Sequence, residues 1–320
     1  MEIKRKNTGE VLLSVDGPTL VGMDLHRKDF HGADFSGVDA SGANFCGAIL
    51  CQADFSRANI QEVDFREVLF DGVNFRDADL NKARMSDTVF RNTDFRGSNL
   101  SGVSLIRADL CGQDLRGVSL VRANMTRANL QRVCFYESNL TGATFDLANL
   151  QGADLQRAKL RGAFFRESYL QGAVLNEVDF YGVNLLESNL SGACLVRSDF
   201  GEATLCRVNF CKANLDSASF RNAKLQGAGF EEAVVCNGIF YGANLEGTDF
   251  SKADLSNSDF RGADICGKQI GPGEWTSAIF HGATMDGVRV DTEVTGGPGF
   301  ILCGLTQDEW DVIRLKRQVK

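Results

Sequence analysis

The segments Arg-Ala-Asn-Leu-Gln (127–131) and Gly-Ala-Asp-Leu-Gln (152–156) are two copies of a five-residue pattern that runs through most of the chain. Every fifth residue from Leu20 to Val290 is large and apolar, with Ala40 as the single exception. The residue two positions before each of these is usually small. A period of five fits neither an amphipathic helix nor an alternating strand, so the chain is a repeat architecture.

Four such units predict a square coil of twenty residues. The large residue points inward from each side, and the small residue before it fills the remaining space, because a second large side chain would overpack the interior. Glycine recurs two positions after the large residue, as at Gly142 and Gly152, where a corner requires unusual backbone angles. Backbone groups would bond to the coils above and below. Residues twenty apart therefore stack on one face.

Segments such as Gly-Ala-Asp-Phe-Ser (32–36) and Gly-Ala-Asn-Leu-Glu (242–246) resemble the Ala-(Asp/Asn)-Leu-x-x motif of pentapeptide repeat proteins. The resemblance covers about residues 16–290. It implies an all-β fold, a right-handed quadrilateral β-helix solenoid. The 55 grid positions, four to a coil, then give nearly fourteen coils.

The ends of a coil stack expose unpaired backbone groups and must be closed. We expect residues 1–15 to form an N-terminal cap segment, residues 16–290 the β-helix, and residues 291–320 a linker followed by a short helix. A capping-box sequence at 306–309 predicts where this C-terminal helix begins. The helix is either a lid over the last coil or a homodimer seam. Its apolar side comprises Trp310, Val312 and Ile313.

The composition narrows the function classes. The net charge is −8, from 42 acidic and 34 basic residues, which disfavours direct nucleic-acid binding. No apolar stretch approaches the roughly 18 residues of a membrane span, and the N-terminus lacks the apolar core of a secretory signal. We therefore expect a cytoplasmic protein with no membrane partner. The ten cysteines show no CxxC spacing, so free thiols are expected and no metal or cofactor.

Outward positions stack into columns that are candidate contact surfaces. One column precedes the large residue on a single face and is acidic or amide-bearing, interrupted by Cys134. Its members, the acidic ladder, are Asp34, Asp54, Asn74, Asp94, Asp114 and Asp154. Such residues either bond the local backbone, as repeat motifs require, or form a charged rail that resembles nucleic-acid phosphates.

Apolar residues replace the usual polar ones in two places, and a stacked set of exposed apolar side chains suggests an interface. The first set occupies the Asp/Asn slot on three successive coils of one face: Ile49, Leu69 and Val89. The second set lies on another face: Leu147, Phe164 and Leu186. The alternative is that neighbouring long side chains cover these residues.

An enzyme is not expected. The histidines are His26, His31 and His281, the last far along the chain from the others. The sequence has no P-loop, Rossmann glycine pattern or nucleophile elbow.

Three hypotheses for function remain. The first is a non-enzymatic scaffold that presents the faces of a β-helix to a protein partner. The second follows from the resemblance, because the quinolone-resistance members of the family engage type II topoisomerase (DNA gyrase) as DNA mimics. The third is a self-assembling structural protein, with the C-terminal segment joining two copies.

Overall fold

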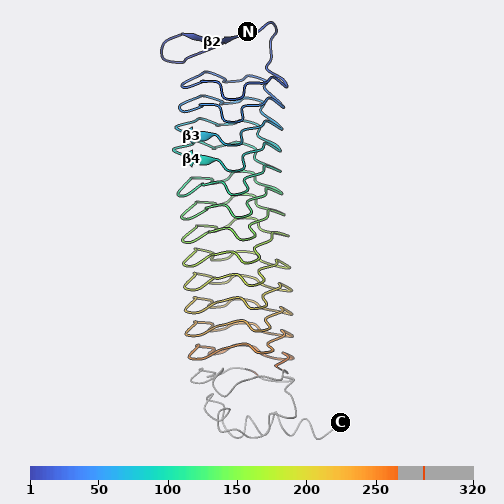
Figure 1. Cartoon of the computed structure of the whole chain (residues 1–320). Helices are drawn as coiled ribbons and strands as arrows, with labels where there is room; N and C mark the ends of the chain where they lie inside the picture. The colour runs from blue at the N-terminus through green and yellow to red at the C-terminus, as the bar shows by residue number, and fades with distance from the viewer. Residues whose placement is uncertain (266–283, 285–320) are drawn as a thin grey trace, which may run out of the picture. The chain divides into compact units, whose positions relative to one another are not determined.

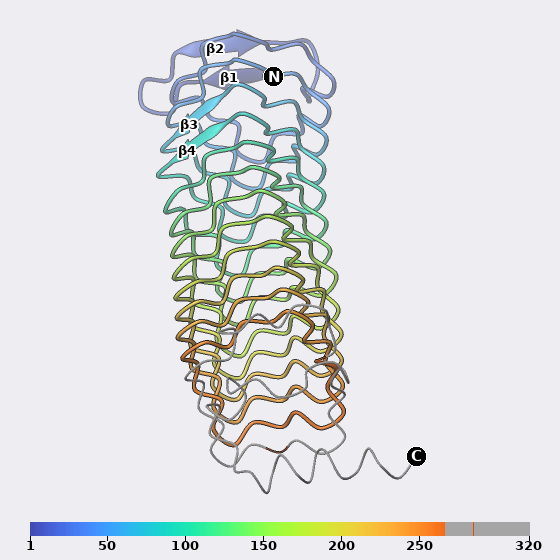
Figure 2. The ribbon, with the colours of Figure 1, turned by 60° about the horizontal axis from the view of Figure 1, so that its bottom comes forward.

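The computed structural model describes residues 1–265 and residue 284. The chain divides into two units, Met1–Phe164 and Phe165–Lys320, which are described separately. In each unit the backbone winds through successive coils of twenty residues, and Figures 1 and 2 show these coils stacked on one another. The described residues contain no helix. No helix in this part of the chain is therefore long and apolar enough to span a membrane.

Hydrogen bonds between coils set the twenty-residue register. The Phe35 N–H donates to the Asp54 carbonyl (2.7 Å), and the Asp54 N–H donates to the Ala33 carbonyl (2.9 Å). The resulting bridges are parallel and join residues twenty apart, such as Asp34 with Asp54 in the first unit and Asn189 with Asn209 in the second. Each coil thus satisfies the backbone groups of its neighbours, as a buried ladder must.

The inward residues form a continuous core in each unit, as the five-residue period predicts. The large central side chains are fully buried, and so are the small residues two positions earlier, such as Ala53 and Ala58. Ala40 is also buried. Several hydroxyls that replace the small side chain donate to the carbonyl three residues before them, as Ser98 does to Phe95 (2.6 Å), and others donate to the preceding coil, as Ser198 does to Leu175 (2.8 Å).

Phenylalanine rings from successive coils stack along the core. In the second unit Phe200 and Phe220 lie 5.1 Å apart with ring planes at 3°, and Phe220 and Phe240 lie 4.9 Å apart at 8°. Parallel stacking of this kind adds about 0.5–1.5 kcal/mol per pair to the burial of apolar area.

The corners are left-handed turns. Gly142 and Gly152 have φ of 67° and 65°, which confirms the role predicted for glycine. Long polar residues adopt the same conformation at other corners; Arg57 has a φ of 58°, and the Ala58 N–H closes its turn on the Phe55 carbonyl (3.0 Å). These residues accept a backbone cost of roughly 1–2 kcal/mol because the coil above and below fixes the turn.

Among residues 1–265, four strands have three or more residues, all in the first unit. An antiparallel hairpin pairs β1 (Glu2–Lys4) with β2 (Val11–Ser14), and a parallel pair joins β3 (Leu69–Asp71) to β4 (Val89–Arg91). The hairpin bonds to the first coil, where the Asp34 N–H donates to the Lys4 carbonyl (2.8 Å). It therefore satisfies a backbone donor at the end of the stack.

An ion pair also ties the hairpin segment to the coils. The Lys6 ammonium contacts the carboxylate of Asp54, which is buried. Burial alone would raise the pKa of Asp54, but hydrogen bonds from Lys6 and Ser56 outweigh it and lower that pKa below its ordinary value. The same hydrogen bond raises the pKa of Lys6.

The predicted C-terminal helix lies outside the described residues, with Trp310, Val312 and Ile313. The division into a cap, a β-helix to residue 290 and a linker therefore stays a prediction, as does the count of coils.

Replacing Phe220 with Ala removes one ring from the stack of the second unit. We expect the free energy of unfolding to fall by about 3–5 kcal/mol, because the cavity cannot collapse between fixed coils. Denaturant unfolding followed by circular dichroism measures this change. The control is Val234→Ala at an exposed site of the same unit, with an expected cost below about 0.5 kcal/mol. Equal costs would contradict the stacked core.

Replacing Asp54 with Asn keeps the acceptor for Ser56 and removes the ion pair with Lys6. We expect amides of β1 and β2 to exchange with solvent several-fold faster, since a pair with one exposed partner is worth about 1 kcal/mol or less. The native advantage over the variant should hold at neutral pH. It should vanish as pH falls through the lowered pKa of Asp54, because only the ionised carboxylate pairs. Hydrogen exchange at several pH values measures the ratio of the exchange rates of the variant and the native chain. A ratio that does not change with pH contradicts the ion pair.

Candidate protein interface

Ile49, Leu69 and Val89, here called the apolar stripe, occupy equivalent positions on successive coils of one face of the first unit. Leu69 and Val89 are direct partners in the β3–β4 pair. The exposed fraction is 51% for Ile49 and 43% for Leu69, while Val89 is half-buried. The structure thus brings the three residues together, and neighbouring side chains leave the first two exposed.

The residues of the stripe lack the side-chain acceptor that most equivalent positions carry. At most equivalent positions a side-chain oxygen accepts the N–H two residues later, as Asp34 does from Ser36 (3.0 Å). Leu69 and Val89 have no such acceptor, and in the described coils theirs are the segments that extend into three-residue strands. Side chains on a strand stand roughly perpendicular to the sheet, so these two point away from the core.

Carboxylates surround the stripe. On the column of the stripe itself, Asp29 bridges to Ile49 at one end and Asp109 bridges to Val89 at the other. Glu67 and Asp71 flank Leu69 on its own coil. Rows of exposed apolar side chains with a polar rim are typical of protein contact surfaces.

The second apolar set has members in both units, so its forming one surface stays a prediction. Leu147 and Phe164 belong to the first unit, where Leu147 sits half-buried at a left-handed corner (φ 61°) and Phe164 is 45% exposed. Leu186 belongs to the second unit and is half-buried. The set is therefore divided between units that are described separately.

Several further apolar residues are exposed that the sequence pattern did not single out. They lie directly before or after the central residue of their repeats, mostly singly. An apolar residue at a position that is usually polar was the sequence signal that could have found them. In the second unit they are Tyr169, Tyr181, Val234 and Tyr241.

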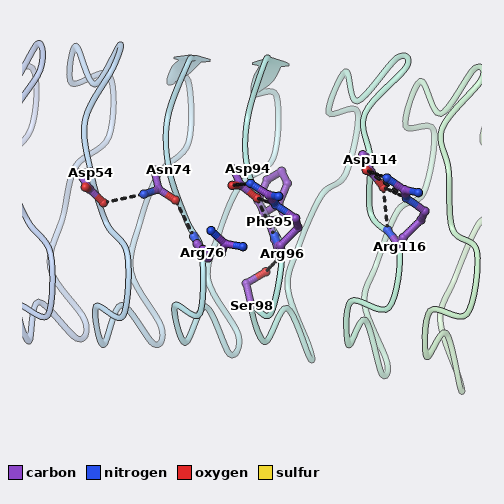
Figure 3. Close-up of polar contacts among 9 residues, drawn as sticks. All are labelled: Asp54, Asn74, Arg76, Asp94, Phe95, Arg96, Ser98, Asp114 and Arg116. Atoms are coloured by element: carbon purple, nitrogen blue, oxygen red, sulfur yellow. Dashed lines mark hydrogen bonds and ion pairs between the residues drawn. The ribbon is translucent and has the colours of Figure 1, made fainter.

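The acidic ladder lies on one face of the first unit, as predicted. Parallel bridges join Asp34 to Asp54, Asp54 to Asn74 and Asn74 to Asp94, and the column continues through Asp114 and Cys134 to Asp154. Each of these Asp or Asn side chains accepts a backbone N–H two residues on, such as that of Arg76 on Asn74 (3.0 Å). Figure 3 shows the middle of this column.

Cations neutralise much of the ladder. The guanidinium of Arg96 binds both oxygens of Asp94 (2.9 and 2.6 Å), and Arg116 binds Asp114 in the same way (2.8 and 2.6 Å; Figure 3). These hydrogen bonds hold the pKa of each Asp below its ordinary value. With Lys6 on Asp54, three of the five ladder carboxylates are in ion pairs. The column is therefore not a continuous row of unpaired negative charges.

Other groups give no reactive centre in the described part of the chain. No cluster of three His, Cys, Asp or Glu side chains there could hold a metal. The eight described cysteines are free thiols. Burial raises the pKa of Cys46, Cys134 and Cys211, and burial together with Asp254 raises that of Cys236 to about 11. Such thiols are poor nucleophiles at neutral pH.

Solved structures of several pentapeptide repeat proteins are similar to this chain. HetL, involved in heterocyst differentiation regulation in the cyanobacterium Nostoc sp. strain PCC 7120, is 24% identical over 72% of this chain and 86% of its own, with a TM-score of 0.22. A protein of the Arabidopsis thaliana thylakoid lumen is 28% identical over 46% and 68%, with a TM-score of 0.17. Full-length QnrB1, a plasmid-mediated fluoroquinolone resistance protein, is 16% identical over 94% and 97%, with a TM-score of 0.12.

No curated protein matches the chain. The family of pentapeptide repeats matches it in eight copies. They cover residues 29–66, 69–106, 104–142, 135–166, 148–185, 165–201, 193–231 and 228–265. These copies account for well over half of the sequence, in the same part where coils of twenty residues stack through parallel bridges. The chain therefore belongs to the pentapeptide repeat family, and its fold is that family's right-handed β-helix.

Proposed function

We propose that this chain is a non-enzymatic protein-binding scaffold and that the apolar stripe is one of its contact surfaces. The observation that carries the proposal is the exposure of Ile49 and Leu69 on adjacent coils, with Val89 beside them. Single exposed apolar residues are normal, whereas a stacked row on a rigid face favours contact with a partner.

The rigidity of the coils supports this role. Every side chain of the stripe projects from a backbone held by hydrogen bonds to the coils on both sides, for example Phe90 N–H to the Asp109 carbonyl (2.9 Å). A surface ordered before binding loses little conformational entropy when a partner docks. The three apolar side chains thus form a small contact surface that is ordered before a partner binds.

The alternative of a DNA mimic draws less support from the acidic ladder. Asp54, Asp94 and Asp114 are already paired with cations of this chain. A partner that binds DNA phosphates would have to displace Arg96 and Arg116, whose bidentate hydrogen bonds are of the stronger kind. We therefore assign the ladder to the stability of the coils.

Replacing Leu69 with Asp should weaken capture of the partner at least about tenfold, because loss of one buried Leu contact is worth roughly 1.5–3 kcal/mol. The measurement is affinity capture from host lysate with quantitative mass spectrometry. The matched control is Val21→Asp, which places the same charge on an apolar residue that is 53% exposed outside the stripe. Thermal unfolding checks that both variants fold. If the two variants and the native chain retain the same proteins, the stripe is not a contact surface.

A further inference from the structure

The charges around the apolar stripe indicate the chemistry of its partner. Leu69, the middle residue, lies between Glu67 and Asp71 on the same coil, and the ends of the column are Asp29 and Asp109. Exposed apolar area at the centre with acids at both flanks and both ends fits a ligand that carries the opposite charge pattern.

These carboxylates are not neutralised within the described part of the chain. Asp29 accepts the backbone N–H of His31 (2.9 Å), and Asp71 accepts the side-chain amide of Asn92 (3.3 Å). Asp109 accepts the amide of Asn129 (2.8 Å) and the N–H of Cys111 (3.1 Å). All of these donors are uncharged, and no described ion pair includes Glu67.

Cations lie near the ends of the stripe and beside Asp71. Arg27 and Lys28 precede Asp29 at one end, and Arg91 follows Val89 on β4, where it lies opposite Asp71 in the β3–β4 register without a described ion pair to it. Arg107 is already bound to Asp87 by two hydrogen bonds of 2.6 Å. Leu69 is the one residue of the stripe with a carboxylate on both flanks.

The spacing of the stripe matches a helix laid along the stack. Hydrogen-bonded coils are separated by about 4.8 Å, and successive turns of an α-helix by about 5.4 Å. Alternate residues of a strand on one face are spaced by roughly 6.8 Å, which misses the middle coil. An added strand also has no ladder to join here, because coils lie on both sides: the Phe90 N–H bonds Asp109, and the Gly72 N–H bonds Arg91 (each 2.9 Å).

A second copy of this chain fits the stripe poorly. A two-fold axis through Leu69 places Glu67 opposite either its own counterpart or Asp71 of the other copy, depending on the direction of the axis. In both arrangements carboxylates face carboxylates at the centre of the contact. Like charges across an interface are unfavourable.

We propose that the apolar stripe binds an amphipathic helix of a partner protein, with apolar side chains on three successive turns and Lys or Arg on both sides of the middle one. The inference rests on the proposed function and adds the class of partner. The three apolar side chains pack on Ile49, Leu69 and Val89. The flanking cations pair with Glu67 and Asp71.

Two helical peptides test this partner class. Both carry Leu on successive turns of one face; one has Lys on the flanks and its twin has Glu. Fluorescence anisotropy against the full chain should show at least about tenfold tighter binding of the Lys peptide, with affinity falling as salt rises. Replacing Leu69 with Ser should weaken that binding without changing charge. The double variant Glu67→Lys, Asp71→Lys should invert the preference and favour the Glu peptide.

A matched control separates a local effect from the net charge of the protein. Glu246→Lys with Asp249→Lys makes the same charge change in the second unit and should leave the preference for the Lys peptide intact. Equal affinities for the two peptides, inversion by this control as well, or no binding of the Lys peptide overturns the inference. If lysate capture still depends on Leu69 in that case, the scaffold proposal stands and only the partner class is wrong. If capture does not depend on Leu69, the scaffold proposal itself fails.

Discussion

The hydrogen bond between a backbone N–H and a carbonyl nineteen residues later is the constraint on which the coils of each unit depend. The bond from Phe35 to Asp54 and its counterpart from Asp54 to Ala33 lock two coils in a register of twenty. Because the register is fixed, side chains of one repeat position stack on their equivalents above and below. Core rings, corner residues and outward polar groups therefore form columns. The residues of one column contact each other, so their packing and charges must be compatible.

In the columns that stabilise the fold, polar side chains find their hydrogen-bond and ion-pair partners within the chain itself. The acidic ladder places its oxygens on backbone N–H groups and takes amide or guanidinium partners from its own chain, such as Asn74 on Asp54 (3.0 Å) and Arg96 on Asp94. Corner columns do the same, with Lys82 on Glu62 (3.2 Å) and Arg157 on Glu137 (3.2 Å). Stacked like charges would repel, and these pairings remove much of that cost.

Much of this was predictable from the sequence, because the five-residue period has one structural solution. The buried centres, the small inward residues and the glycine corners follow from side-chain size and backbone freedom alone. The left-handed conformation of Arg57 was not predictable in the same way, since local propensity opposes it and only the neighbouring coils impose it. Nor was the pairing of Lys6 with Asp54, which joins residues far apart in the sequence through a hairpin outside the repeat.

The apolar stripe is informative because it departs from the repeat at the same position on three successive coils. An Asp or Asn at each of its positions would accept a backbone N–H, a hydrogen bond worth about 0.5–1.5 kcal/mol. Ile49 and Leu69 give up that bond and leave apolar surface in water instead. A single apolar residue in place of Asp or Asn is common at a surface position. Here the replacement recurs on three successive coils, and carboxylates that form no described ion pair border it. A partner that covers this column would restore to the complex the stability that the column costs its own chain.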